Sequence, residues 1–410
     1  MSTAAQRPLD APDIPTTIRR HDEAVRRFGD LAAPYFDGMW IGDPLADAFV
    51  ADFATIGHGR GMRMLRQACT QGIDAVDDPP DSLRALFAEL DDVPDWVDFE
   101  VLNHGGRHIG RYTRQAGIVL GAASLVSGYA NSAASRPLQL TGRYVESAGA
   151  RTIEVGSWLV EVLAHDGLRR HSPGFELTVR VRIIHALVRQ SLVSSDEWDS
   201  AAWGVPICQA YLAYTLVEFC LIPLRGMRAV GAPFLPHEAD AYYARWRYVG
   251  HLLGISPDLL PVDEADQEAL EAIYLLSRPV VDDFCRDLVG SINAEFLVPE
   301  IEEILPRALH RAAPPIVQAL ERIFLGDEIA DELAVPDTRL KHVIRFVGLV
   351  LGVVNAGLDR VPFSLPVRAA LGERYRVKQD VRLRSRYGVQ HDLVDASPEG
   401  DRPHPARDPA

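Results

Sequence analysis

The sequence predicts an all-α protein built as a single large helical domain. Apolar residues recur at spacings of three and four along most of the 410-residue chain, which is the pattern of helices with one buried face. Alternating, β-branched segments typical of strands are scarce. No internal repeat or change of composition divides the helical part, and a hydrophobic content of 47% is ample for one large core.

The expected helices follow one another along the chain, and Gly, Pro and Asp mark most of the gaps between them. They cover residues 43–53, 62–75, 83–90, 110–130, 151–165, 176–194, 206–221, 237–253, 264–287, 301–324 and 340–355, with a further segment opening at residues 94–98. Within residues 110–130, Gly117, Gly121 and Ser124 would let a neighbouring helix or a flat ligand come close.

The two ends of the chain differ from this helical part. Residues 1–38 are expected as an N-terminal arm, residues 39–378 as the helical domain and residues 379–410 as a disordered tail. The longest apolar stretches, 116–130 and 343–358, are shorter than the ~20 residues that span a bilayer. We expect both to be buried core helices, with no transmembrane segment.

Composition excludes several classes of function. A net charge of −15 argues against nucleic acid and against anionic membrane surfaces. The four cysteines form no CxxC or CxxCH, so a thiolate zinc site, an iron–sulfur cluster and covalently attached haem are not expected. Few cysteines, and an N-terminus without the apolar core of a secretion signal, predict a cytoplasmic location. No motif supports a serine hydrolase or nucleotide binding.

The most informative residue is His185, at the edge of the apolar stripe of the helix expected over residues 176–194. Arg182 and Arg189 flank it at i−3 and i+4, where helix side chains are neighbours. An imidazole in these surroundings can bind a metal from inside an apolar pocket, and the arginines can pair with acidic groups of the metal's carrier. The alternative is a hydrogen-bonded core histidine beside two surface arginines.

A second group of polar residues lies on the helix expected over residues 151–165. Four of its side chains share one face, namely Glu154, Trp158, Glu161 and His165. Arg151 lies one turn before Glu154 and can pair with it. A tryptophan on a polar face fits the wall of a pocket, and a solvated face with an Arg–Glu pair is the alternative.

Several segments, taken as an ordered set, resemble the latex-clearing-protein family, which also includes prenyl-cleaving oxygenases of mycophenolic acid biosynthesis. The similar segments are residues 42–47 (GDPLAD), 127–143 (SGYANSAASRPLQLTGR), Arg151, 181–189 (VRIIHALVR), 203–206 (WGVP), 214–219 and 243–254 (YARWRYVGHLLG). The resemblance spans roughly residues 40–370, and no single motif carries it alone.

The resemblance implies a globin-like helical core around a pocket for non-covalent haem b, with His185 as the proximal iron ligand. It also implies that the helix beginning at Arg151 supplies the distal side, and that O₂ is used to cleave carbon–carbon double bonds. Arg182 and Arg189 would then be cofactor-binding residues that hold haem propionates. Arg151 and Glu154 would be catalytic residues that position O₂ or move a proton.

The chain also departs from the family pattern. Rubber-cleaving members have a lysine three residues after the arginine and a threonine beside it, where this chain has Glu154 and Val155. The upstream acid proposed as their base has no clear counterpart, and Glu146 is the nearest acid. Because a secretion signal is not found, rubber itself is not the expected substrate.

The sequence therefore predicts a cytoplasmic haem b oxygenase acting with O₂ on a small hydrophobic molecule, for which an isoprenoid is the candidate. A need for an electron donor stays open. One alternative is a non-haem metal–carboxylate oxidoreductase that uses Glu154, Glu161, His165 and His185. The other is a non-enzymatic haem- or lipid-binding protein.

Overall fold

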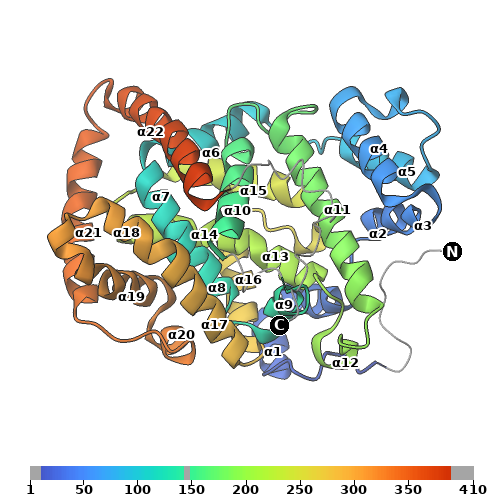
Figure 1. Cartoon of the computed structure of the whole chain (residues 1–410), viewed down its shortest axis with the longest axis horizontal. Coiled ribbons are helices and arrows are strands. Elements are labelled where there is room, and N and C mark those ends of the chain that lie inside the picture. The colour runs from blue at the N-terminus through green and yellow to red at the C-terminus, as the bar shows by residue number, and fades with distance from the viewer. Residues whose placement is uncertain (1–10, 143–147, 389–410) are drawn as a thin grey trace, which may run out of the picture.

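The computed structural model describes residues 11–142 and 148–388, which form helices joined by short connections (Figure 1). No strand occurs within these residues, so the all-α prediction is confirmed. The α-helices up to residue 203 are α1 (His21–Asp37), α2 (Pro44–Ala51), α3 (Phe53–Ile56), α4 (His58–Gln71), α5 (Asp81–Asp91), α6 (Phe99–Arg111), α7 (Thr113–Val119), α8 (Val126–Gly128), α9 (Ser132–Leu140), α10 (Ala148–Val162), α11 (Pro173–Val193) and α12 (Ser200–Trp203).

The second half of the chain continues in the same way. Its α-helices are α13 (Gln209–Phe219), α14 (Leu221–Ala229), α15 (Pro236–Leu252), α16 (Glu264–Ser277), α17 (Asp283–Ile292), α18 (Val298–Ile304), α19 (Ala313–Leu325), α20 (Asp327–Glu332), α21 (Leu340–Leu358) and α22 (Ser364–Tyr387). Two π-helical segments, η3 (Leu120–Leu125) and η5 (Asn293–Leu297), connect helices that run on from each other.

Two clusters of buried apolar side chains hold these helices together. The larger cluster contains most of the buried side chains of α13 and α15, including Trp246, which is fully buried. The smaller cluster joins η3 and η5 to α17 and α19. A Cβ at Gly121 would lie 2.7 Å from a methyl group of Leu297, so the small residue expected to allow a close helix approach does so here. Helices α2–α5 lie at one end of the molecule and α21 lies at the opposite edge (Figure 1).

Local signals in the sequence start several of the helices. Asp43 caps α2 by accepting a hydrogen bond from the backbone nitrogen of Ala46, and Asp98 and Asn131 cap α6 and α9 in the same way. Ser172 caps α11, and Pro173 follows at the first helical position. These contacts satisfy backbone donors that the first turn of a helix leaves unpaired.

The structure changes the expected boundaries. The N-terminal arm includes α1, which buries Ala24, Tyr35 and Phe36 in the larger cluster, so residue 38 does not separate an arm from the helical domain. Helix α22 runs to Tyr387, past the expected end of the domain at residue 378. Two expected helices, over residues 264–287 and 301–324, are each divided into two at Ser277 and Ile304.

The prediction for the two apolar stretches is half right. Residues 116–130 are largely buried, with Val119, Ala123 and Val126 fully enclosed. Residues 343–358, expected as a buried core helix, instead belong to α21, and most of their apolar side chains are exposed. Hydropathy alone did not reveal this, because it does not say whether a helix lies inside or at the edge of the molecule.

Candidate functional site

The candidate site is built on α10 and α11, which run in opposite directions. The start of α11 packs against the end of α10, where a Cβ at Gly174 would lie 2.7 Å from the backbone oxygen of Glu161. Farther along, Nε1 of Trp158 donates a hydrogen bond to Oγ1 of Thr178 at 3.1 Å. Arg151 and His185 each lie seven residues beyond this contact, roughly 10 Å along their helices and in the same direction.

A buried arginine fixes the end of α10. The guanidinium of Arg245, on α15, donates to the backbone oxygens of Val162 and Ala164 at 2.8 and 2.7 Å, and to that of Leu102 at 2.7 Å. Burial lowers the pKa of Arg245 to about 10. A positive charge at the C-terminus of a helix is favourable because the carbonyl groups there point outward. The site helix is therefore held by a residue from one of the segments that resemble the family.

His185 lies on α11 at the boundary of two flanks. Val181, Ile184 and Val188 on one side keep partial exposure, whereas Arg182 and Arg189 on the other side are buried. The Nδ1 atom of His185 is buried and has no hydrogen-bond partner in the part of the chain that the structure describes. Burial and the charge of Arg189 lower the pKa of His185 to about 4. The ring is thus a neutral imidazole at pH 7, which is the form that binds a metal.

The two arginines beside His185 have partners within the protein. Arg182 donates to both carboxylate oxygens of Asp43, at 2.6 and 3.0 Å, and to Glu89 at 2.7 Å. Burial would lower the pKa of Arg182, but the two carboxylates outweigh it and raise the pKa above its ordinary value.

Arg189 is held in the same way. Its guanidinium pairs with Asp47 and donates to the backbone oxygens of Pro206 and Ile207 at 3.1 and 3.0 Å. Every side-chain nitrogen of Arg182 and Arg189 therefore has a protein acceptor. These acceptors, two acids of α2 and its cap, Glu89 and two backbone oxygens, occupy the guanidinium groups that were expected to pair with a ligand's carboxylates.

Arg151 and Glu154 form the expected pair on α10. Nη1 of Arg151 donates to Oε2 of Glu154 at 3.0 Å, and the side chains are 36% and 28% exposed. By helical spacing they share a face with Val155 and Trp158, and Trp158 contacts α11. No hydrogen bond or ion pair joins them to His185 within residues 148–388. Glu146, the nearest upstream acid, lies outside the described residues.

The histidine and acid farther along α10 do not build a metal site with the others. His165 lies next to Asp166, with its Nδ1 atom 3.2 Å from a carboxylate oxygen, and its side chain is 59% exposed. The described residues contain no group of three or more His, Cys, Asp or Glu side chains that could hold a metal ion. The set of Glu154, Glu161, His165 and His185 is therefore not brought together.

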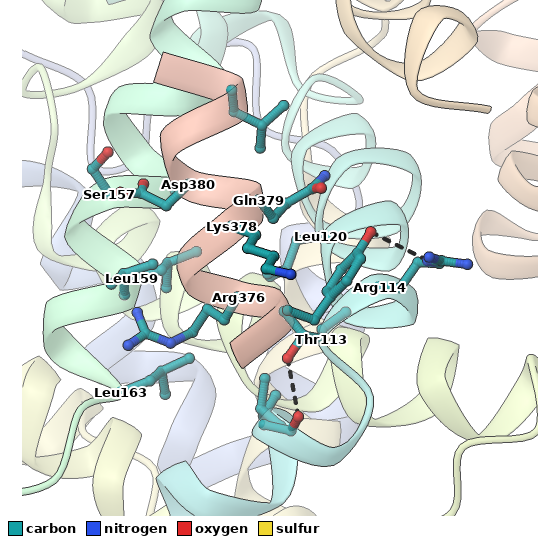
Figure 2. A pocket seen from close by; sticks show the side chains of 18 of the residues that line it. Thr113, Arg114, Leu120, Ser157, Leu159, Leu163, Arg376, Lys378, Gln379 and Asp380 are labelled. Carbon is teal, nitrogen blue, oxygen red and sulfur yellow. Dashed lines mark hydrogen bonds between the residues drawn. The ribbon is translucent and has the colours of Figure 1, made fainter. Parts of the chain in front are cut away.

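A cavity of about 940 Å³ lies on the other face of α10, between α6, α7 and α22. Figure 2 shows Ser157 and Leu159 of α10, and Leu163 just after its end, beside Arg376, Lys378, Gln379 and Asp380 of α22. Much of the lining is apolar, including Ile109, Ala116, Ile153, Val160, Phe296 and Leu297. Neither His185 nor Arg151 nor Glu154 lines it, so α10 separates this cavity from the histidine.

Two glycines keep part of this cavity open. Gly117 and Gly156 both line it, and a Cβ added to either would meet no atom within 4 Å. Ser157 also lines the cavity, and its hydroxyl is buried without a hydrogen-bond partner. A volume of this size suits a small hydrophobic ligand, since pockets for small molecules are about 300–1,000 Å³.

Sequence reasoning missed a half-buried acid with a raised pKa. Glu218, on α13, has no ion pair within the described residues, and burial raises the pKa of its carboxyl to about 8. Its Oε1 atom would lie only 2.7 Å from a Cβ at Gly128, which belongs to the segment most similar to the family. The signal in the sequence was a single acid inside an otherwise apolar helix, LAYTLVEFCLI. Shifted acids of this kind gather at functional sites.

Comparison with known proteins places the chain in a family. The family described as "ER-bound oxygenase mpaB/B'/Rubber oxygenase, catalytic domain" matches residues 110–355, more than half of the chain and including α10 and α11. The chain therefore belongs to this family of oxygenase catalytic domains. The predicted resemblance to latex-clearing proteins is thereby confirmed.

Two relatives can be compared in detail. The chain is 24% identical over 354 residues to the rubber oxygenase of Streptomyces sp. (strain K30), covering 83% of this chain and 82% of the relative. The solved structure of a latex clearing protein, LCP, in the closed state superposes with a TM-score of 0.64 at 20% identity, covering 83% of this chain and 91% of that one. At this identity the superposition shows that the fold is shared.

Proposed function

We propose that this protein is a haem b-dependent oxygenase that uses O₂ on a small hydrophobic substrate of the isoprenoid type, with oxidative cleavage of a carbon–carbon double bond as the favoured reaction. The observation that carries the proposal is His185. It is a half-buried, neutral imidazole whose Nδ1 atom has no hydrogen-bond partner among the described residues, on a helix flank whose neighbours are not fully packed. Such a ring could hold haem iron.

The residues around His185 would hold the ring in place rather than bind the cofactor. Arg182 and Arg189 tie α11 to Asp43 and Asp47 one turn to each side of the histidine. Both ion pairs are buried, so they fix the helix and its rotation about its own axis. We therefore assign the two arginines a positioning role. When bound, haem would supply the activation of O₂, which no side chain of the protein provides.

Arg151 and Glu154 are the proposed distal residues. Their pair is partly exposed, and it lies on the side of α10 that turns toward α11. A carboxylate held by an arginine can accept and return a proton, and the arginine could donate hydrogen bonds to a polar group of the reactants. Glu154 stands where rubber-cleaving members have lysine, so the distal side of this protein would be more acidic.

The substrate class is proposed chiefly from the family, because the relative from Streptomyces is named a rubber oxygenase and rubber is an isoprenoid polymer. The cavity behind α10 is rich in Ile, Leu and Ala and could hold such a molecule, but α10 lies between this cavity and His185. We propose a shorter isoprenoid molecule for this chain. A cytoplasmic location stays part of the proposal, and it is supported by four buried, unpaired cysteines.

Absorption spectroscopy tests the proposal. The wild type, produced with ample haem precursor, is expected to show a Soret band that His185→Ala loses. His251→Ala is the matched control, because His251 is another partly buried histidine with a lowered pKa and a buried ring nitrogen without a partner. Circular dichroism of all three proteins separates loss of haem from loss of fold.

Each outcome decides between the candidates. A Soret band that survives in His185→Ala, or is absent from the wild type, overturns the assignment of His185. Iron without porphyrin would favour a non-haem oxygenase. Haem binding without O₂ uptake, measured with squalene and with farnesol, would favour the haem carrier.

A further inference from the structure

The apolar side chains of α21 point away from the protein. Of the 26 exposed large hydrophobic side chains in the described residues, 14 lie between Val343 and Val381. Nine belong to α21 and are each at least 43% exposed, namely Val343, Phe346, Val347, Leu349, Val350, Leu351, Val353, Val354 and Leu358. Phe363, between α21 and α22, is 83% exposed. Single exposed apolar residues are ordinary, but a contiguous patch marks an interaction surface.

Helix α21 contacts the rest of the protein mainly through small and polar residues, together with Ile344, which packs against the smaller cluster. A Cβ at Gly348 would lie 2.1 Å from the backbone oxygen of Ala229, and Nδ2 of Asn355 donates to the backbone oxygen of Gly231 at 2.6 Å. Lys341, one heptad before Gly348, is buried in ion pairs. A helix at a protein–water boundary has the reverse arrangement. The outer face of α21 is therefore suited to contact with an apolar partner rather than with water.

The same part of the chain is basic. Residues 339–388 contain eleven Arg and Lys residues and three Asp and Glu residues, a formal charge of +8 in a chain whose net charge is −15. Six of these basic residues are exposed, namely Arg339, Arg345, Arg360, Arg374, Lys378 and Arg386. The negative charge that argued against anionic membranes lies elsewhere in the chain and does not describe this face.

We propose that α21, α22 and their connection form a membrane-binding surface that rests in the headgroup region of a bilayer rich in anionic phospholipid. Exposed apolar residues insert at the boundary of the acyl chains, and basic residues attract the negative headgroups. A second copy of the chain is the weaker candidate, because two segments of charge +8 would face each other. Helix α21 is long and apolar enough to cross a membrane by length and composition. Its attachment from Lys341 to Asn355 holds it along the protein instead.

The proposed surface adjoins the cavity. A Cβ at Gly372 of α22 would lie 1.6 Å from the backbone oxygen of Gly110, so α22 is held directly against α6. Ala369 and Ala370 line the cavity, whereas Val367 and Leu371 are exposed. Figure 2 shows α22 passing across the cavity beside α10. If the proposed function holds, an apolar substrate dissolved in the bilayer would enter beside this helix; membrane binding itself does not depend on that function.

Vesicle flotation of the full chain tests the proposal, without substrate. Wild type is expected to float with vesicles of phosphatidylcholine and phosphatidylglycerol, and less with phosphatidylcholine alone. Phe346→Ser/Val350→Ser/Phe363→Ser should lower the affinity at least about tenfold, because three apolar anchors are lost. The matched control is Val262→Ser/Val280→Ser, which changes exposed apolar residues outside this surface.

Charge is tested separately. Arg345→Gln/Arg374→Gln should weaken binding to the anionic vesicles by about fivefold for each arginine. Arg60→Gln/Arg63→Gln, on exposed residues of α4, is the matched control. Wild type that stays unbound with both kinds of vesicle, or surface variants that bind as the wild type does, would overturn the proposal. A lipid-free dimer that the triple serine variant converts to monomer would also overturn it, by assigning the surface to a second copy. Haem content, read in the same samples, reports on the proposed function independently.

Discussion

Arg182 and Asp43 form a buried, two-pronged ion pair, with nitrogen–oxygen distances of 2.6 and 3.0 Å, that joins the helix of His185 to the start of α2. The partners are 139 residues apart in sequence and belong to two segments that each resemble the family. The pair thus joins the GDPLAD and VRIIHALVR segments in the folded protein. Asp43 and Asp47 pair with Arg182 and Arg189, and these ion pairs fix the position of the helix that carries His185.

Breaking this pair should destabilise the protein strongly. Arg182→Met leaves the Asp43 carboxylate buried without its partner, and we expect the free energy of unfolding to fall by about 3–5 kcal/mol. Asp43→Asn keeps a side chain that can cap α2, so the decrease in its free energy of unfolding reports mainly on the lost charge. In urea unfolding, the free energy of unfolding should fall less in the Arg182→Met/Asp43→Asn double variant than the sum of its decreases in the two single variants. Additive losses would show that the two residues do not act as a pair.

Glu154 should matter for turnover and little for stability. Its pair with Arg151 is partly exposed, so Glu154→Gln is expected to change the free energy of unfolding by less than about 1 kcal/mol. If Glu154 moves a proton, turnover measured as O₂ uptake should fall by about a hundredfold or more. Glu161→Gln, on the same helix, is the control. If Glu154→Gln and Glu161→Gln have equal turnover, Glu154 does not take part in the proposed reaction.

Filling the cavity should weaken substrate binding without harming the fold. Gly156→Leu and Gly117→Leu place a side chain where a Cβ meets no atom within 4 Å. Replacing a helical glycine should itself favour folding by up to about 1 kcal/mol. We expect KM for a hydrophobic substrate to rise by about tenfold, with the thermal midpoint unchanged or higher.

The control for cavity filling is Gly290→Leu. Gly290 is also helical, has no atom within 4 Å of an added Cβ, and does not line the cavity. If KM rises equally in all three variants, the cavity is not where the substrate binds.

Glu218 should make stability depend on pH. Burial raises the pKa of its carboxyl from about 4.5 to about 8, so the folded protein keeps a proton that the unfolded chain releases between these values. Its contribution is fully present below about pH 4.5 and is lost progressively as pH rises toward 8. Glu218→Gln should therefore gain stability relative to the wild type between about pH 5 and 8 in urea unfolding. A difference between the two proteins that stays constant with pH would show that Glu218 does not titrate in this way.

The helical periodicity, with the Gly, Pro and Asp residues that separate the helices, was sufficient to predict the fold class and most of the helices. The helix expected over residues 176–194 is present as α11 and begins three residues earlier, at Pro173, with Ser172 as its cap. The spacing of Arg151 and Glu154 likewise predicted their ion pair, since one turn of helix brings them together. His185 was recognised by its place on an apolar stripe and by the family resemblance.

Other features depend on contacts between distant segments. The partners of Arg182 and Arg189 come from residues 43, 47, 89, 206 and 207, and no local pattern says that an arginine will meet these rather than a ligand. The exposure of α21 is of the same kind. Its composition is that of a core helix, and only its position at the edge of the molecule leaves the apolar face uncovered.

The sequence by itself thus determined which segments are helical, where several of them begin, and which histidine is the candidate metal ligand. The tertiary structure decided what each side chain meets. In the folded protein the arginines beside His185 pair with Asp43 and Asp47, Nδ1 of His185 has no hydrogen-bond partner among the described residues, and the cavity lies behind α10. The physical reason is range. Capping and helical periodicity act within a few residues, whereas burial and the pairing of charges depend on how far-apart parts of the chain come together.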